Sequence, residues 1–260
     1  MVERTLQGRV AIVTGASRER GIGAAVCRAL AQRGADVVFT HWQAYDREMA
    51  WGAEASFPEQ LAAELAGLGV RALALEADLS DAATPARIID VAGQLGPPRI
   101  LVNNAAHSTH DGYQALDAAT LDAHYAVNLR GTALLAVEFC RRYDGQPGGR
   151  IINFTSGQSL GPMPGELAYI ATKGAIEAFT RTLAVEVGHL GITVNAVDPG
   201  PTDTGWMPED LKTRLARQFP AGRLGQAEDA ARLVAFLADD AAAWVTGQVI
   251  HSDGGFFPGG

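Results

Sequence analysis

Apolar and polar residues follow each other along the chain in a regular succession of short strands and longer helices. Nearly continuous apolar runs predict seven strands, at residues 9–15, 35–41, 71–78, 99–106, 150–157, 192–200 and 248–255. Apolar residues at helical spacing predict helices at residues 22–33, 57–68, 82–94, 117–143, 167–189 and 227–238. Strands without polar alternation should be buried on both faces. The pattern therefore predicts an α/β fold of the Rossmann type: a doubly wound, seven-stranded parallel sheet with helices on both faces.

Two connections are longer than the others, 42–56 after the second strand and 201–226 after the sixth. Long connections at the carboxyl ends of parallel strands usually serve ligands. No linker or repeat interrupts the pattern, so we expect residues 1–260 to form a single domain.

Composition narrows the class of protein. The 260 residues are 47% hydrophobic and 19% charged, as in a soluble protein with a large core. The net charge of −8 argues against nucleic acid or an anionic membrane as a partner. The N-terminal segment has no signal-peptide core, and no run approaches the ~18 apolar residues of a membrane span. Cys27 and Cys140 fall in helical patterns and are expected to be reduced thiols, so we predict a cytoplasmic location.

The stretch TGASRERGIG, residues 14–23, lies between the first strand and the first helix. Gly15 permits a tight turn, and Gly21 and Gly23 let the helix begin close to a diphosphate, whose charge suits a helix N-terminus. Ser17 and Ile22 belong to the same loop. A glycine loop alone is weak support, but it predicts dinucleotide binding.

The end of the second strand bears on the choice of cofactor. Folds that bind NAD often place a carboxylate there to hold the ribose 2′-hydroxyl, but residues 39–42 read FTHW. Four cationic side chains lie near this position: Arg18, Arg20, His41 and Arg47. A 2′-phosphate requires cationic donors, so the sequence favours NADP(H). NAD(H) remains an alternative, because Asp46 or Glu48 could fold back to the ribose.

Tyr169 and Lys173 lie four residues apart on one predicted helix, so both project from the same face. A neighbouring ammonium would lower the pKa of the tyrosine and suit it for acid–base catalysis. Ser156 ends the fifth strand, where its hydroxyl could bind a carbonyl oxygen, and Asn128 lies in the preceding helix. Tyr-x-x-x-Lys alone is common by chance, but here it occurs together with Ser156 and Asn128.

The chain resembles the short-chain dehydrogenase/reductase family over nearly its whole length. The glycine loop, NNAA at 103–106, Asn128, Ser156, Tyr-x-x-x-Lys and Pro199-Gly200 occur in the family's order. The resemblance implies a nicotinamide-dependent oxidoreductase with Tyr169 as acid or base and Ser156 polarising the carbonyl. It also implies that Lys173 binds the nicotinamide ribose and keeps Tyr169 acidic, and that Asn128 holds a water in the proton path.

The same resemblance assigns further cofactor contacts. Asp78 would contact the adenine, with Leu79 beside it. Asn104 and Ala105 would line the adenosine side of the channel. Thr202, which follows Pro199 and Gly200, would touch the carboxamide.

The glycine loop departs from the family pattern, since five residues rather than three separate its first two glycines. Enoyl-thioester reductases of the superfamily also have a longer loop, but their tyrosine stands seven residues before the lysine. That position is Glu166 here, so we predict carbonyl reduction instead. A protein that binds NADP without turnover is the alternative from another class. It is disfavoured because all four catalytic positions are intact.

Among these enzymes the chain is most similar to 3-oxoacyl-thioester reductases. Members that use acyl carrier protein place basic residues where this chain has Pro147 and Leu190. Two acidic partners dock poorly, so acyl carrier protein is a doubtful partner. A free ketone, an aldehyde, a sugar-type alcohol or a coenzyme A thioester remains an alternative small-molecule substrate.

Four residues are expected in the substrate pocket: His107, Gln158, Met163 and Trp206. His107 and His110 are only two ligands, so we predict no metal site. Segment 201–220 carries Trp206, Met207 and Phe219, which would be costly to expose permanently and predict a lid. Segments 117–143 and 167–189 are apolar on more than one face, which predicts a homodimer or homotetramer.

Overall fold

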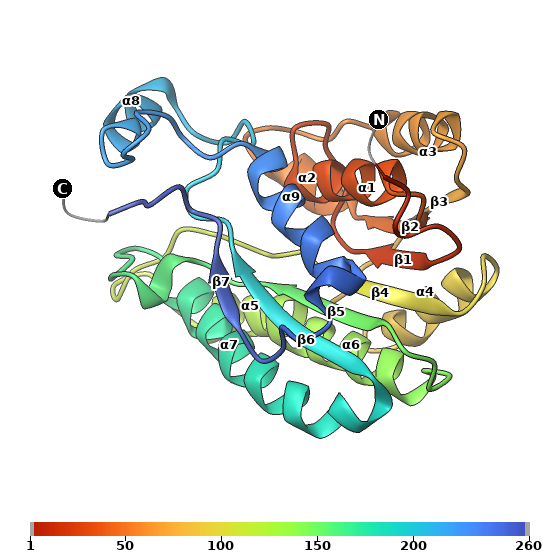
Figure 1. Ribbon diagram of the computed structural model, residues 1–260. Coiled ribbons are helices and arrows are strands. Elements are labelled where there is room, and N and C mark those ends of the chain that lie inside the picture. Colours follow the sequence, from red (N-terminus) through yellow and green to blue (C-terminus); the bar gives the residue numbers. More distant parts are fainter. Residues whose placement is uncertain (1–2, 258–260) are drawn as a thin grey trace.

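The computed structural model describes residues 3–257 and is built on a seven-stranded parallel sheet (Figure 1). The strand order is β3-β2-β1-β4-β5-β6-β7. The strands are β1 (Val10–Val13), β2 (Asp36–His41), β3 (Ala72–Glu76), β4 (Pro98–Asn103), β5 (Gly149–Phe154), β6 (Ile192–Asp198) and β7 (Val249–His251). The order reverses between β1 and β4, and such a switch point opens a crevice at the carboxyl ends of the strands. The predicted fold class is confirmed.

Helices cover both faces of the sheet (Figure 1). One layer contains α1 (Ile22–Gln32), α3 (Phe57–Gly67) and α9 (Ala227–Ala238), and the other contains α4 (Thr84–Gly93), α6 (Thr132–Arg141) and α7 (Leu167–Val187). Successive side chains of β4 point to opposite faces of the sheet. Ile100 packs in the hydrophobic core beneath α1, α3 and α9, and Leu101 packs in the core beneath α4, α6 and α7. Both faces of the central strands β1, β2, β4, β5 and β6 are therefore largely buried, as the strand composition predicts, whereas the edge strands β3 and β7 are partly exposed.

The predicted helix at 117–143 is divided into three parts. These are α5 (Ala118–His124), a wider π-helical turn (Tyr125–Gly131) and α6. A Cβ on Gly131 would lie 2.7 Å from the carbonyl oxygen of Leu79, so the π-turn approaches the loop after β3 closely. Single π-turns inside helices are frequent at functional sites, and this one contains Asn128.

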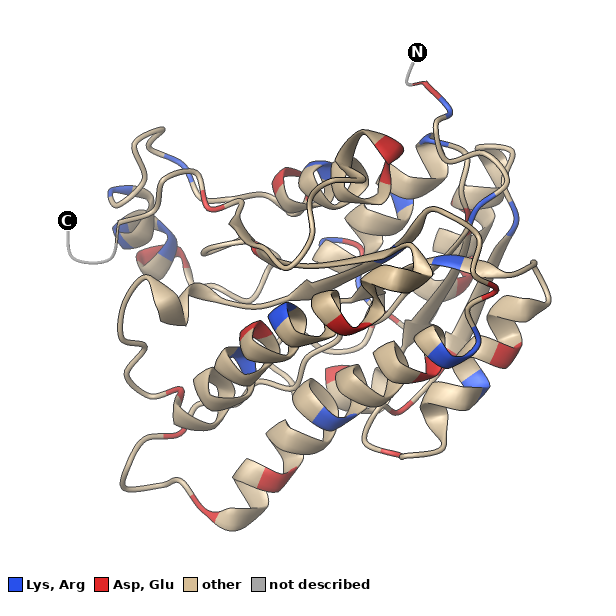
Figure 2. Cartoon of the chain, turned by 60° about the horizontal axis from the view of Figure 1, so that its bottom comes forward, with Lys and Arg blue, Asp and Glu red and all other residues tan. Residues whose placement is uncertain are grey.

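The two long connections each contain a short helix, α2 (Gln43–Glu48) and α8 (Glu209–Ala216). Three 3₁₀ turns complete the described elements, at Gly157–Ser159, Gly188–Leu190 and Asp240–Ala242. Basic and acidic residues are interspersed along the helices (Figure 2), and many pair one turn apart or across neighbouring elements.

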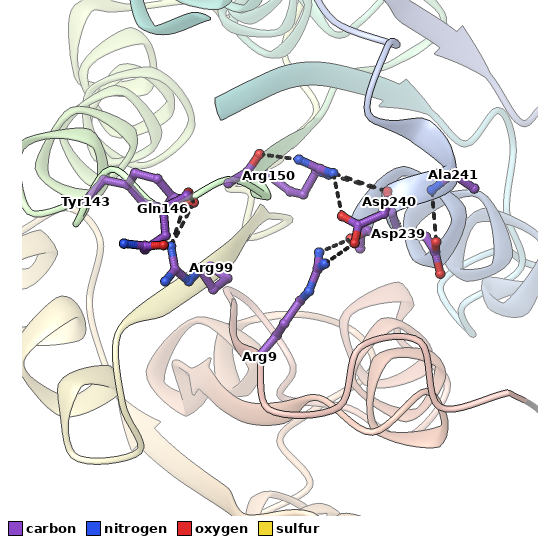
Figure 3. Close-up of polar contacts among 10 residues, drawn as sticks. Arg9, Arg99, Tyr143, Gln146, Arg150, Asp239, Asp240 and Ala241 are labelled. Atoms are coloured by element: carbon purple, nitrogen blue, oxygen red, sulfur yellow. Dashed lines mark hydrogen bonds and ion pairs between the residues drawn. The ribbon is translucent and has the colours of Figure 1, made fainter. Parts of the chain in front are cut away.

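The amino ends of the strands are fastened by buried and half-buried arginines (Figure 3). Arg150 on β5 is fully enclosed and donates to the Asp240 carboxylate at 3.1 Å, and Arg9 before β1 pairs with the same carboxylate. Arg99 on β4 pairs with Asp144. Burial lowers the pKa of Arg150. These pairs lie at the edge opposite the crevice and stabilise the sheet there.

Candidate active site

The glycine loop is docked between the ends of β2 and β4. Backbone N–H groups of Gly15 and Ala16 donate to Thr40, at 3.2 and 2.7 Å. The Asn104 side chain donates to the carbonyls of Thr14 and Gly15, each at 2.9 Å. Asn104 therefore holds the glycine loop in place. The resemblance implied only that it lines the adenosine side of the channel.

Glycine is required at two positions of this loop. A Cβ on Gly15 would lie 2.7 Å from the Cα of Ala105, and one on Gly23 would lie 2.3 Å from the carbonyl oxygen of Gly15. The N-cap Gly21 has no side chain to satisfy the first N–H groups of α1, which begins at Ile22. A close-approaching backbone with free helix N–H groups fits a dinucleotide diphosphate.

The two arginines of the glycine loop go to different places. Arg18 lies 4.4 Å from the ring centroid of Trp51 and 3.7 Å from Asp46. Arg20 instead pairs at 3.0 Å with Asp203, at the start of the long segment after β6. Of the two loop arginines, Arg18 is therefore the one that contacts the segment after β2 in this structure. A contact of Arg20 with the cofactor stays a prediction.

The remaining predicted cofactor residues line the carboxyl edge of the sheet. Ser17 accepts from Trp42 N–H at 3.2 Å, and Asp78 accepts from Ser80 N–H at 2.8 Å, which fixes Leu79 against the π-turn. Burial lowers the pKa of His41, whose Nδ1 has no partner among the described residues.

After β6, the chain turns sharply at Pro199 and Gly200. The Thr202 hydroxyl donates back to the carbonyls of Pro199 and Gly200, each at 3.1 Å. Thr202 is buried, so its hydroxyl holds this turn in place.

Tyr169 lies in the first turn of α7, close to Ser156 at the end of β5. The Lys173 ammonium donates to the carbonyl of Phe154 at 2.9 Å and lies 5.5 Å from the centroid of the Tyr169 ring. Lys173 is only 3% exposed. The Asp111 carboxylate accepts from the N–H groups of Leu167 and Ala168, which fixes the start of α7.

Burial controls the ionisation of this cluster. Burial raises the pKa of Tyr169, and a hydrogen bond with Ser156 opposes the rise. Burial lowers the pKa of Lys173 to about 8. In the protein without cofactor, desolvation has the largest influence on Tyr169 and favours the neutral phenol. The lowering of its pKa by Lys173 together with an oxidised nicotinamide stays a prediction. Tyr169 therefore carries its proton at neutral pH.

The side chain of Asn128 forms hydrogen bonds within the protein. Its Oδ1 accepts from His107 N–H at 2.7 Å, and its Nδ2 donates to His107 C=O at 2.9 Å and to Thr172 Oγ1 at 3.1 Å. Both N–H donors of the amide are thus occupied. The amide oxygen accepts only one of these hydrogen bonds and keeps a second lone pair. The water-holding role implied by the resemblance stays a prediction.

The four predicted substrate residues have different surroundings. The His107 ring lies between Tyr45 and His124, with centroids 5.3 and 4.7 Å away, and burial lowers its pKa. The Met163 sulfur lies 4.0 Å from Ser156 Oγ, next to the reacting centre. The Gln158 amide nitrogen donates to Thr155 and to Glu177 on α7, whereas its amide oxygen has no partner among the described residues, so its place in the substrate pocket stays a prediction.

The argument for a lid is only partly supported. Met207 and Phe219 are buried with Leu224 in a small cluster of their own, against which Phe256 packs. These two residues are therefore covered without a substrate, so their apolar character does not require a lid. Trp206, which was predicted to line the substrate pocket, lies outside this cluster and is 42% exposed.

One pair at the site, a buried carboxylate and an exposed histidine, was not anticipated. The Asp198 carboxylate is fully enclosed at the end of β6 and lies 2.9 Å from His251 Nδ1 on β7. It also accepts from Gly200 N–H at 2.9 Å. In the sequence, the only sign of this pair was the carboxylate of VDPG at the end of a largely apolar strand.

Comparisons with known proteins agree with this geometry. A family model described as "Enoyl-(Acyl carrier protein) reductase" matches residues 15–257. The chain is 53% identical to an uncharacterized oxidoreductase, YjdA, of Bacillus subtilis, over 97% of this chain and 98% of that protein. It is 40% identical to the 3-oxoacyl-[acyl-carrier-protein] reductase FabG of Pseudomonas aeruginosa, over 97% and 99%.

Solved structures are similar over the same length. A short-chain dehydrogenase/reductase from Serratia marcescens has a TM-score of 0.87 at 36% identity, covering 98% of this chain and 100% of that one. A blue fluorescent protein from a metagenomic library, in complex with NADPH, has a TM-score of 0.86 at 36% identity, covering 97% and 99%. In the part of the chain that the structure describes, no helix combines the length and apolar character of a membrane span. The chain belongs to the short-chain dehydrogenase/reductase family of oxidoreductases.

Proposed function

We propose that the protein is an NADP(H)-dependent reductase that interconverts a carbonyl and a secondary alcohol, most closely a 3-oxoacyl-thioester reductase. The observation that carries the proposal is the cluster at the start of α7. There Tyr169 keeps its proton beside Ser156, and a buried Lys173 ammonium lies below the ring. A neutral phenol next to a second hydroxyl suits proton donation to a carbonyl oxygen.

NADP(H) is the cofactor that the loop favours. The glycines fit a diphosphate, Arg18 lies at the adenosine end, and a structural neighbour is described as a complex with NADPH. Gly15, Gly21 and Gly23 would hold the diphosphate, and Lys173 would hold the nicotinamide ribose. NADPH, when bound, supplies the hydride.

The side chains of this chain would do the rest. Ser156 donates a hydrogen bond to the carbonyl oxygen and orients the carbonyl. Tyr169 donates its proton to the same oxygen, and in the oxidative direction it takes that proton back. The Lys173 ammonium, fixed on the Phe154 carbonyl, stabilises the charge that forms on Tyr169. Asn128 keeps the loop of His107 against α7, which closes one side of the site.

Carbonyl reduction is favoured over enoyl reduction, despite the description of the family model. The residue seven before Lys173 is Glu166, at the N-cap of α7, and burial raises its pKa. A carboxyl group at this position does not replace a tyrosine as donor.

A 3-oxoacyl thioester is the proposed substrate, on the similarity to FabG. A free ketone or aldehyde is the second candidate, favoured by the missing basic residues at Pro147 and Leu190 and by the interspersed surface charges (Figure 2). We further propose a single-domain homo-oligomer in the cytoplasm. Cys27 and Cys140 are both free thiols, which suits a reducing compartment.

A substrate panel tests the proposal. The purified protein is supplied with NADPH and, in turn, 3-oxoacyl coenzyme A, 3-oxoacyl-[acyl-carrier-protein], simple ketones, aldehydes and enoyl coenzyme A. We expect NADPH consumption with one or more carbonyl compounds and none with the enoyl thioester. Consumption with the enoyl thioester alone would overturn the assignment.

A further inference from the structure

Arg18 is held by an unusual set of contacts from the long connection after β2. Its guanidinium carbon lies 4.4 Å from the centroid of the Trp51 ring, and its Nε lies 3.7 Å from Asp46 Oδ1. The Trp51 indole N–H donates to the same carboxylate oxygen at 2.9 Å. Arg18, Trp51 and Asp46 thus form a closed triad that links the glycine loop to segment 42–56.

Asp46 is committed to this triad. Its residue is 4% exposed, and its carboxylate faces Trp51 and Arg18. A carboxylate so enclosed is a poor ligand for a ribose hydroxyl that enters from solvent. Glu48, the other acid considered for that role, lies on the exposed side of α2. Neither acid therefore presents the ribose contact expected in an NAD-selective site.

Arg18 retains unused hydrogen-bonding capacity. Among residues 3–257 its guanidinium makes one hydrogen bond, from Nη1 to the carbonyl of Thr204 at 3.1 Å. The contact with Asp46 is longer than a hydrogen bond. Burial lowers the pKa of Arg18, which marks a cation that is incompletely compensated. A phosphate dianion would supply both the charge and the missing acceptors.

The triad also lies beside the carboxyl end of β2, next to the expected position of the ribose. Ser17, next to Arg18, accepts from Trp42 N–H directly after β2, and Gly15 and Ala16 are bonded to Thr40. This is the strand end at which dinucleotide-binding folds distinguish the two ribose substituents. Trp51 covers one face of the guanidinium and so restricts its plane before any ligand arrives.

We propose that Trp51 and Asp46 are positioning residues that hold Arg18 for a 2′-phosphate, so that preference for NADP(H) depends on segment 42–56. The inference rests on the proposed function and deepens it. Trp51 supplies a stacking face and a hydrogen bond that anchors Asp46, and Asp46 orients the Nε edge. The remaining N–H groups of Arg18 are left for the phosphate.

The test is calorimetric titration of NADPH and NADH into wild-type protein and into Trp51→Leu, Trp51→Phe and Arg18→Ala. We expect Arg18→Ala to weaken NADPH binding about 10- to 100-fold, the loss of a charged hydrogen-bonding partner. Trp51→Leu should weaken it about fivefold, the loss of a cation–π contact, and Trp51→Phe should retain most of the affinity. NADH binding should stay within twofold in all three (about the error of the method).

Trp244→Leu is the matched control, because Trp244 is fully exposed. It should leave the NADPH to NADH ratio unchanged. Thermal unfolding of each variant without cofactor excludes loss of fold as the cause. Equal losses for the two cofactors in Trp51→Leu, or no loss for either, would overturn the positioning role. Wild-type protein that binds NADH as tightly as NADPH would reject the proposed cofactor itself, whatever Trp51 does.

Discussion

The side chain of Asn128 forms hydrogen bonds with both backbone polar groups of His107: it accepts from the N–H at 2.7 Å and donates to the C=O at 2.9 Å. The amide is buried on the π-turn. Asn128→Ala should leave two backbone groups unpaired and cost about 1–3 kcal/mol of the free energy of unfolding. It should also release the loop at His107 and lower kcat. Denaturant titration and steady-state kinetics measure the two effects.

Asn195 provides a matched control for this variant. It is equally buried on β6 and grips another loop in the same way, donating to Val245 C=O at 2.8 Å and accepting from Gln248 N–H at 3.1 Å. Asn195→Ala should destabilise the fold similarly while kcat is kept. Equal losses of kcat in both variants would show that Asn128 acts through stability alone.

The carboxylate of Asp111 should orient the start of the catalytic helix. It accepts from Leu167 N–H at 2.7 Å and Ala168 N–H at 2.8 Å, just before Tyr169. Asp111→Ala should cost about 1 kcal/mol of stability and reduce kcat, because the first turn of α7 loses its cap. Asp117 caps α5 through Thr120 N–H, and Asp117→Ala should cost as much without lowering kcat. An unchanged kcat in Asp111→Ala would contradict the positioning role.

The lowered pKa of Lys173 predicts that the free energy of unfolding depends on pH. Its pKa is about 8 in the folded protein against 10.5 for an exposed lysine, so between these values the unfolded chain binds more protons. The free energy of unfolding should therefore rise with pH in this window, by about 2 kcal/mol between pH 8 and 10. Lys173→Met should lose that rise. Urea titrations of both proteins at several pH values measure it, and parallel pH profiles would contradict the depressed pKa.

The outer faces of α6 and α7 predict association. Val185 is 86% exposed on α7, and Leu134 on α6 is 37% exposed. Contiguous exposed apolar patches mark interaction sites, and exposed apolar side chains on both helices fit the association that the sequence predicts. Light scattering should show a dimer or tetramer at micromolar concentration, and Val185→Glu should shift it toward monomer. A monomeric wild type would refute the expectation.

Much of the fold could be predicted from the sequence because its signals are local. Apolar runs define the strands, and a parallel sheet with both faces buried follows from their composition. The division of 117–143 was not predictable, since the close approach of Gly131 to Leu79 joins residues that are distant in sequence.

The site was predictable where one motif carries the chemistry, as for Tyr169 and Lys173. It was not predictable where burial or long-range pairing decides. The upward shift in the pKa of Tyr169 depends on its enclosure. The burial of Phe219 depends on Phe256, and the contact of Arg18 with Trp51 depends on how two loops fold together.

Proton donation by Tyr169 is the central claim, and Tyr169→Phe tests it most directly. The variant removes one hydroxyl and keeps the ring beside Lys173. The measurement is single-turnover reduction of the best carbonyl substrate at saturating NADPH, with NADPH affinity determined separately. We expect the rate to fall by about 10²- to 10⁴-fold while NADPH affinity is kept. A near-normal rate with unchanged NADPH affinity would contradict the account.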